Sequence, residues 1–174
     1  MVKVLNPTYD TVFKHLMQNE DVVKALLELM FDYHLCVKII SQRADCYINT
    51  KNSRVYYLPV DAVIIDGPKK LETINFEIYR VVKENFEVLF IIEFMAFAGR
   101  YRSYVEVKEM QEAKSHLEKV LTIFSGGCCK TNDKVIDIDE NFDDSSTYKT
   151  IINALVNISA DDCILKELVN EKPI

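Results

Sequence analysis

The stretch Leu58-Pro59-Val60-Asp61-Ala62-Val63-Ile64-Ile65-Asp66-Gly67-Pro68 decides the fold. Residues 54–65 are rich in β-branched and aromatic residues, which is typical of a strand. Asp66-Gly67-Pro68 is a strong turn signal, and residues 72–81 form a second strand pattern directly after it. The sequence therefore predicts an antiparallel hairpin that places Asp61 on one strand and Glu77 on the next.

The next connection is short, because only four residues, 82–85, separate Val81 from Phe86. A crossover to a parallel strand needs a dozen or more residues, so a strand over 86–94 can only return antiparallel. The alternative is a helix over 85–98 that is stopped by Gly99, with a strand over 101–107 after it. The apolar composition of the segment favours the strand, but both interpretations remain open.

Helical spacing of apolar residues predicts helices on both sides of these strands. We expect a short strand over 37–40, helices over about 8–18, 19–33, 110–124 and 160–169, and a helix that contains the apolar stripe from Tyr148 to Val156. Asn19 and the run 143–146 supply helix caps. The expected organisation is a single α/β domain, with a core over 1–125 and a helical C-terminal extension of the same domain over 126–174.

Size and charge exclude several classes of protein. The chain has 174 residues, of which 49% are hydrophobic, and it can bury a proper core. Its net charge of −6 argues against coating nucleic acid by bulk electrostatics, so any such contact must be local. The most apolar stretch, 86–98, is too short to span a bilayer, and the N-terminus lacks a secretory signal. We expect no membrane partner and a cytoplasmic location.

Cysteine and histidine residues give no metal pattern. The five cysteines contain no C-x-x-C pair, and we expect them to be reduced thiols. The three histidines, His15, His34 and His116, are scattered along helical patterns without a partner at metal spacing, and are expected to be structural or surface residues.

Asp61 and Glu77 are the candidates for chemistry. Both stand among apolar residues, where a charge is costly unless it is paired or bound to a cation. Two carboxylates and one backbone carbonyl supply the oxygen ligands that Mg²⁺ prefers, and a metal held there can polarise a phosphodiester and activate water. Alternatively, such acids face solvent or pair with lysine or arginine.

Several segments, in their order and spacing, resemble the PD-(D/E)XK nuclease family transposases, relatives of the recombination-promoting nucleases. They are Asn6-Pro7-Thr8-Tyr9-Asp10-Thr11-Val12-Phe13-Lys14, Val60-Asp61-Ala62-Val63, Asp66-Gly67 and Ile74-Asn75-Phe76-Glu77-Ile78. Less distinct similarity continues to about residue 140. The resemblance implies a restriction-endonuclease-like core with a central mixed β-sheet, N-terminal helices and a helical C-terminal part. It also implies Mg²⁺ or Mn²⁺ as cofactor and DNA as partner, with homo-oligomerisation left open.

The resemblance assigns roles to individual residues. Asp61 and Glu77 would be metal ligands, and the Ile78 carbonyl would complete the set. Asp10 would be an auxiliary acid from the first helix, although it also suits the helix dipole as a first-turn acid.

Two cations complete the implied site. Lys14 and Arg80 would contact phosphates. The alternative for both is a solvated surface charge.

Two departures from the family count against activity. Tyr79 stands where the family has Gln, and the wider superfamily Lys, to orient or activate the attacking water; a phenol is longer, planar and mostly neutral at pH 7. The family also has a long helix after the strand that carries its active-site Glu, and the four-residue connection 82–85 leaves no room for it here. The resulting hypothesis is metal-dependent hydrolysis of DNA phosphodiesters by an impaired site. The alternative is a catalytically inactive remnant that acts as a DNA- or protein-binding module.

The acidic segment 137–144 is either a solvated loop or a protein-interaction surface.

Overall fold

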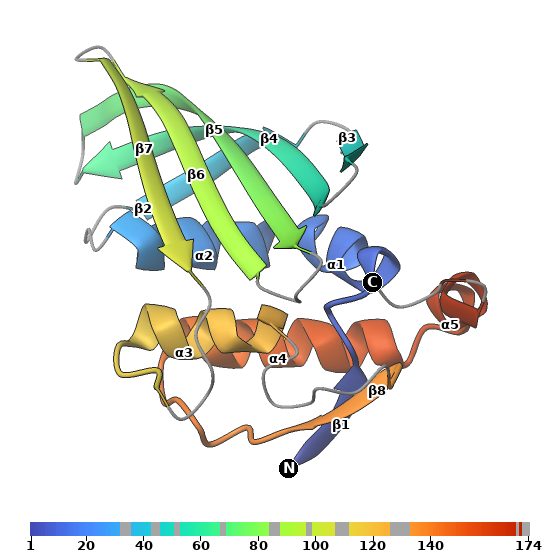
Figure 1. Ribbon diagram of the computed structural model, residues 1–174. Coiled ribbons are helices and arrows are strands. Elements are labelled where there is room, and N and C mark those ends of the chain that lie inside the picture. Colours follow the sequence, from blue (N-terminus) through green and yellow to red (C-terminus); the bar gives the residue numbers. More distant parts are fainter. Residues whose placement is uncertain are drawn as a thin grey trace. The chain divides into compact units, whose positions relative to one another are not determined.

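The computed structural model describes residues 1–31, 36–42, 46–50, 53–66, 69–83, 88–96, 99–106, 112–125, 133–169 and 171 (Figure 1). Side chains are described in 1–29, 112–124, 133–169 and 171. The chain divides into two compact units, Met1–Ala25 with Val107–Ile174 and Leu26–Glu106. The boundary expected between 125 and 126 falls inside the first unit.

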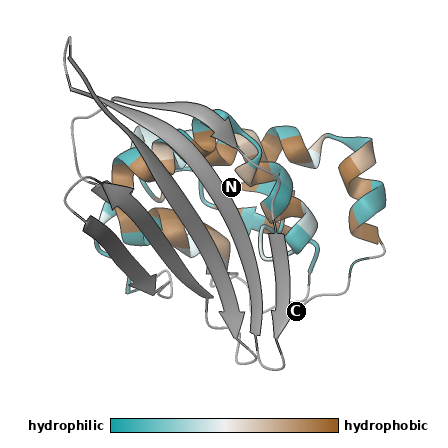
Figure 2. Ribbon diagram, turned by 90° about the horizontal axis from the view of Figure 1, so that it is seen from above, coloured by the Kyte–Doolittle hydropathy of each residue, from teal (hydrophilic) through white to brown (hydrophobic). Residues whose placement is uncertain are grey.

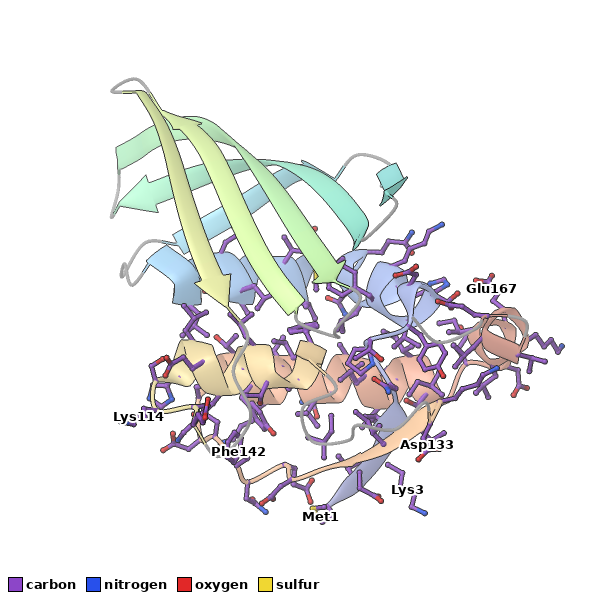
Figure 3. The ribbon with its side chains drawn as sticks, in the orientation of Figure 1. Met1, Lys3, Lys114, Asp133, Phe142 and Glu167 are labelled. Carbon is purple, nitrogen blue, oxygen red and sulfur yellow. The ribbon has the colours of Figure 1, made fainter. Side chains whose placement is uncertain are left out.

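The first unit is mainly helical. Its helices are α1 (Asp10–Met17), the start of α2 (Glu20–Phe31), α3 (His116–Thr122) with the 3₁₀ turn η1 (Ile123–Ser125), α4 (Ser146–Ser159) and α5 (Asp162–Val169). A two-stranded antiparallel sheet is formed by β1 (Val2–Leu5), near the N-terminus, and β8 (Val135–Ile138), which precedes α4. Most of the described side chains lie on this unit, with Glu167 on α5 and Phe142 shortly before α4 (Figure 3).

The core of this unit forms where the apolar stripes of the helices meet. Phe13 of α1 is fully buried and meets Phe124 edge-to-face, with 5.8 Å between the ring centroids. Helix α4 packs against α1 and β1, and its residues Tyr148, Ile151 and Leu155 are buried. Figure 2 shows hydrophobic and hydrophilic residues sharing each helix, as expected of helices that bury one face.

The helix ends follow local hydrogen-bonding chemistry. Asn19 Oδ1 accepts from the backbone N–H groups of Asp21 and Val22, which confirms Asn19 as a cap. Ser145 caps α4, as expected from the run 143–146. Helix α3 begins only at His116, later than expected, because Ser115 and Glu118 form a capping box there.

The second unit is built on a six-stranded sheet. Its strands are β2 (Cys36–Gln42), β3 (Cys46–Thr50), β4 (Ser53–Asp66), β5 (Lys69–Lys83), β6 (Val88–Ala96) and β7 (Gly99–Glu106). Their order is β2-β4-β5-β6-β7, and β3 pairs with β4. The open question about residues 86–94 is settled in favour of a strand, β6, which returns antiparallel to β5.

The expectation of a mixed sheet is wrong for the strands that the structure describes, because every pairing among them is antiparallel. The physical reason is the length of the connections. Residues 67–68 join β4 to β5, residues 84–87 join β5 to β6, and residues 97–98 join β6 to β7. Connections this short permit hairpins and no parallel crossover. The α/β class is confirmed, because the structure contains both helices and β-sheets. The restriction-endonuclease-like core is not confirmed.

Three short strands, β1, β3 and β8, were not expected from the sequence. β1 and β8 have four residues each and pair across more than 120 residues of chain, so no local sequence pattern predicts them. Among the described helices, none has the length and apolar character needed to cross a membrane.

Candidate functional site

The predicted acids lie on the β4–β5 hairpin. Asp61 is opposite Asn75, and Glu77 is opposite Pro59, so the two acids are diagonal neighbours in the ladder. Opposed residues of an antiparallel pair share a face, and residues two apart on one strand share it too. Asp61 and Glu77 therefore belong to one face of the sheet, as a shared cation requires. Diagonal neighbours are typically about 7–8 Å apart, within reach of long side chains. The side chains of Asp61 and Glu77, between which this distance would be measured, lie outside the described residues.

The register adds an acid that the sequence reasoning missed. Glu93 of β6 is directly opposite Glu77. The sequence alone does not single out Glu93, because its place beside Glu77 depends on the pairing of β5 with β6. We call the face to which Asp61, Glu77 and Glu93 belong the acidic face. Like charges directly opposite each other destabilise a sheet, so this face favours a bound cation or a basic neighbour. Arg102 of β7 is opposite Glu93 and is a basic neighbour by register.

The remaining predicted residues of β5 divide between the two faces. Tyr79 belongs to the acidic face and is opposite Tyr57. Ile78 and Arg80 alternate to the other face, where Arg80 is opposite Tyr56 and Phe90. The role expected of Ile78 uses its backbone carbonyl and does not depend on the face. A phosphate held at the acids would lie across the sheet from Arg80, which counts against the expected contact by this residue.

Asp10 and Lys14 belong to the first unit, whereas the acids belong to the second. Asp10 is the first residue of α1, and its backbone N–H donates to Glu171 Oε1 at 2.6 Å. The N–H of Thr11 donates to Glu171 Oε2 at 3.1 Å. The carboxylate of Glu171 therefore caps α1, whose N-cap residue Tyr9 makes no side-chain cap hydrogen bond. The catalytic role of Asp10 and the phosphate contact of Lys14 stay predictions.

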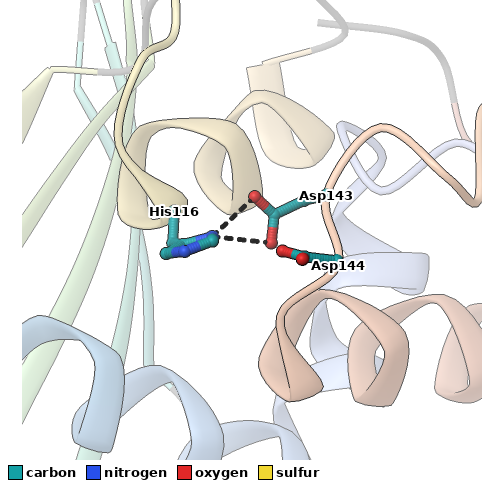
Figure 4. Close-up of side chains that lie close together, drawn as sticks. All are labelled: His116, Asp143 and Asp144. Carbon is teal, nitrogen blue, oxygen red and sulfur yellow. Dashed lines mark hydrogen bonds and ion pairs between the residues drawn. The ribbon is translucent and has the colours of Figure 1, made fainter.

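A second cluster, His116 with Asp143 and Asp144, lies in the first unit (Figure 4). The imidazole Nδ1 of His116 is 2.8 Å and 3.0 Å from the two carboxylate oxygens of Asp143. The side chain of Asp143 is fully buried. Its Oδ1 also accepts from the backbone N–H of Ser145 at 2.8 Å, and Lys119 Nζ is 3.6 Å from its Oδ2.

One ligand atom from each of these three residues lies within 4.8 Å of the others, which is close enough for a metal ion. Two observations favour an ion-pair cluster instead. Lys119 already brings a positive charge to Asp143, and a cation placed there would be repelled by it. Burial raises the pKa of the Asp143 carboxyl, but hydrogen bonds from Ser145 and His116 and the charge of His116 outweigh this effect and lower the pKa below its ordinary value of 3.8. The cluster thus joins α3 to the start of α4.

The sequence had suggested no partner for His116. The contact joins residues 27 positions apart in the chain, so local spacing does not reveal it. The available signal was the pair of capping patterns that fix the two helix starts, Ser115-x-x-Glu118 and the run 143–146.

Comparisons of the chain with protein-family models, with curated proteins and with solved structures found no match. The resemblance to the nuclease family transposases therefore stays a prediction from the sequence.

Proposed function

We propose that the acidic face binds a divalent cation and hydrolyses DNA phosphodiester bonds. The observation that carries the proposal is the register of three neighbouring strands. It makes Asp61 and Glu77 diagonal neighbours and sets Glu93 directly opposite Glu77. Three carboxylates gathered on one face supply only oxygen ligands, which fits Mg²⁺ or Mn²⁺.

Each acid has a defined part in this proposal. Asp61 and Glu77 hold the cation with the backbone carbonyl of Ile78, and Glu93 adds negative charge beside Glu77. When bound, the cation supplies Lewis-acid polarisation of the phosphate and lowers the pKa of water. Carboxylates brought together by the sheet would hold the cation in place, so that the cost of arranging charge would be met on folding and not during the reaction.

Tyr79 favours a second candidate function. It shares the acidic face with Glu77 but lacks the amide of Gln and the ammonium of Lys. A neutral phenol is a weak group for orienting water. The second candidate is therefore an inactive remnant that still binds DNA or protein through this face.

The first test is metal binding. Thermal unfolding with and without Mn²⁺ or Mg²⁺ should show stabilisation, by about 2.7 kcal/mol at a hundredfold excess over Kd. Glu77→Gln should abolish the response. Glu72→Gln is the matched control, because Glu72 is on the same strand but alternates to the other face. No response of the wild-type chain to either ion would contradict the proposal.

The second test separates the enzyme from the remnant. Nicking of supercoiled plasmid is measured for the wild type, for Glu77→Gln and for Tyr79→Gln. The enzyme predicts wild-type activity that Glu77→Gln removes and Tyr79→Gln raises. If the protein binds metal but neither the wild type nor Tyr79→Gln nicks the plasmid, the result favours the inactive remnant.

A further inference from the structure

Tyrosine residues form a row across the acidic face. Tyr79 of β5 is opposite Tyr57 of β4 on one side and Ile91 of β6 on the other, and Ile91 is opposite Tyr104 of β7. The row thus crosses four adjacent strands and contains three tyrosines. It is two residues from the Glu77–Glu93 pair along the strands, which corresponds to roughly 7 Å.

Two arginines mark the edge of the same face. Arg100 and Arg102 alternate to it on β7, the last strand in the order of the sheet. Arg102 is opposite Glu93, whereas Arg100 is opposite Met95. Along this edge Arg100 and Arg102 are followed on the same face by Tyr104 and Glu106, so the positive charge is confined to the half of the edge beside Glu93.

The opposite face differs in composition. Two of its rows join Leu58, Ile78, Ile92 and Ser103, and Val60, Phe76, Phe94 and Tyr101. An antiparallel sheet commonly buries its apolar face and presents its polar face to solvent. The acidic face also carries an apolar row, Val55, Val81 and Leu89, but its charged rows make it the more polar of the two faces, and the tyrosine row lies beside them.

We propose that the acidic face binds single-stranded DNA, with unpaired bases stacked on Tyr57, Tyr79 and Tyr104 and phosphates held by Arg100 and Arg102. This inference rests on the proposed function and narrows its substrate from DNA in general to an unpaired strand. Base stacking requires exposed π-faces, which duplex DNA hides within its own stack. A positively charged edge that follows the phosphates, together with aromatic positions for the bases, is the usual chemistry of single-strand binding.

The inference also gives Tyr79 a purpose. Its place in the middle of the tyrosine row makes it part of a stacking platform. A Tyr in place of the Gln expected from the resemblance therefore raises the affinity for the single strand but orients the attacking water less well. Tyr79→Gln should then weaken binding of the strand while raising turnover.

The test measures fluorescence polarisation of a labelled 12-nucleotide oligothymidine, and of a 12-base-pair duplex, with Mg²⁺ and with EDTA. The wild type should bind the single strand more tightly than the duplex. Tyr57→Leu and Tyr104→Leu should each raise the Kd for the single strand about 5- to 150-fold, which corresponds to the usual loss of about 1–3 kcal/mol per stacked base.

The matched controls are Tyr56→Leu and Tyr101→Leu, which change a tyrosine on the same two strands but on the opposite face. Their Kd should stay within about twofold of the wild type. Circular dichroism and the thermal midpoint verify folding of each variant. Equal losses for Tyr101→Leu and Tyr104→Leu, or duplex bound as tightly as single strand, would overturn the inference.

The two proposals fail in different ways. If Mn²⁺ still stabilises Tyr57→Leu and Tyr104→Leu while neither variant loses affinity for the oligothymidine, the stacking inference is wrong and the metal site stands. If Mn²⁺ does not stabilise the wild type, but the wild type binds the oligothymidine in EDTA and Tyr57→Leu and Tyr104→Leu raise the Kd, the metal site is wrong and the stacking inference stands.

Discussion

The helical unit and the sheet unit use their acids in opposite ways. In the helical unit, Asp143 is buried with His116, Lys119 and Ser145 around its carboxylate, and Glu171 caps the N-terminus of α1. In the sheet unit, the register sets Glu77 opposite Glu93, which brings like charges together. The acids described in the helical unit are matched with donors, whereas the register sets Glu77 between Pro59 and another acid, Glu93. The substitutions below test this difference, because they should change stability with opposite signs.

The largest effect should come from Asp143→Asn. Asn keeps the shape but removes the charge that holds His116 and Lys119, and it supplies one acceptor in place of two. We expect a loss of about 2 kcal/mol in the free energy of unfolding, measured by urea denaturation. Asp144→Asn, at the exposed neighbouring residue, should change stability by less than about 0.5 kcal/mol. Equal effects at both positions would remove the special role of the buried acid.

The same group should give the helical unit an acid-sensitive component. Because folding lowers the pKa of Asp143 below 3.8, the unfolded chain binds this proton more readily than the folded chain does. The stabilisation is therefore complete above the unfolded pKa and is lost as pH falls through the folded pKa. Urea denaturation from pH 6 to pH 2 should show a shallower loss below about pH 4 for Asp143→Asn than for the wild type. Parallel curves would show that another group causes the acid sensitivity.

Glu171→Gln should have a smaller effect. It removes the charge at the N-terminus of α1 and puts an N–H donor where one oxygen accepts from the backbone of Asp10 or Thr11. We expect a loss of about 1 kcal/mol in the free energy of unfolding. Glu167→Gln is the control: Glu167 is exposed and pairs with His15 at 3.3 Å, and its loss should cost less than about 0.5 kcal/mol. A larger loss for Glu167→Gln would mean that the ion pair of α5 with His15, and not the cap, anchors the end of the chain.

How far the sequence predicted this molecule depended on the distance over which each signal acts. The hairpin of β4 and β5 followed from composition and a turn signal, because a hairpin is decided within a few residues, whereas the segment of β6 was left open between strand and helix. The pairing of β1 with β8 and the contact of His116 with Asp143 join distant segments, and no local pattern contains them. The same holds within the candidate site. Asp61 and Glu77 were identified on one hairpin, but Glu93 entered only when the register of β6 was known.

The smallest expected effect on the free energy of unfolding is that of Glu77→Gln in the absence of metal. The sign of this effect shows whether the acids of the sheet unit differ from those of the helical unit. Removing one of two directly opposed carboxylates should raise the free energy of unfolding by about 0.5 kcal/mol in the absence of divalent ions. Excess Mn²⁺ should reverse the order of stability, because only the wild type gains from the ion. Glu72→Gln, on the other face of β5, should show neither effect. If Glu77→Gln destabilises the metal-free chain as Asp143→Asn does, then Glu77 has a structural partner of its own, and the acids of the sheet stabilise the fold as those of the helical unit do.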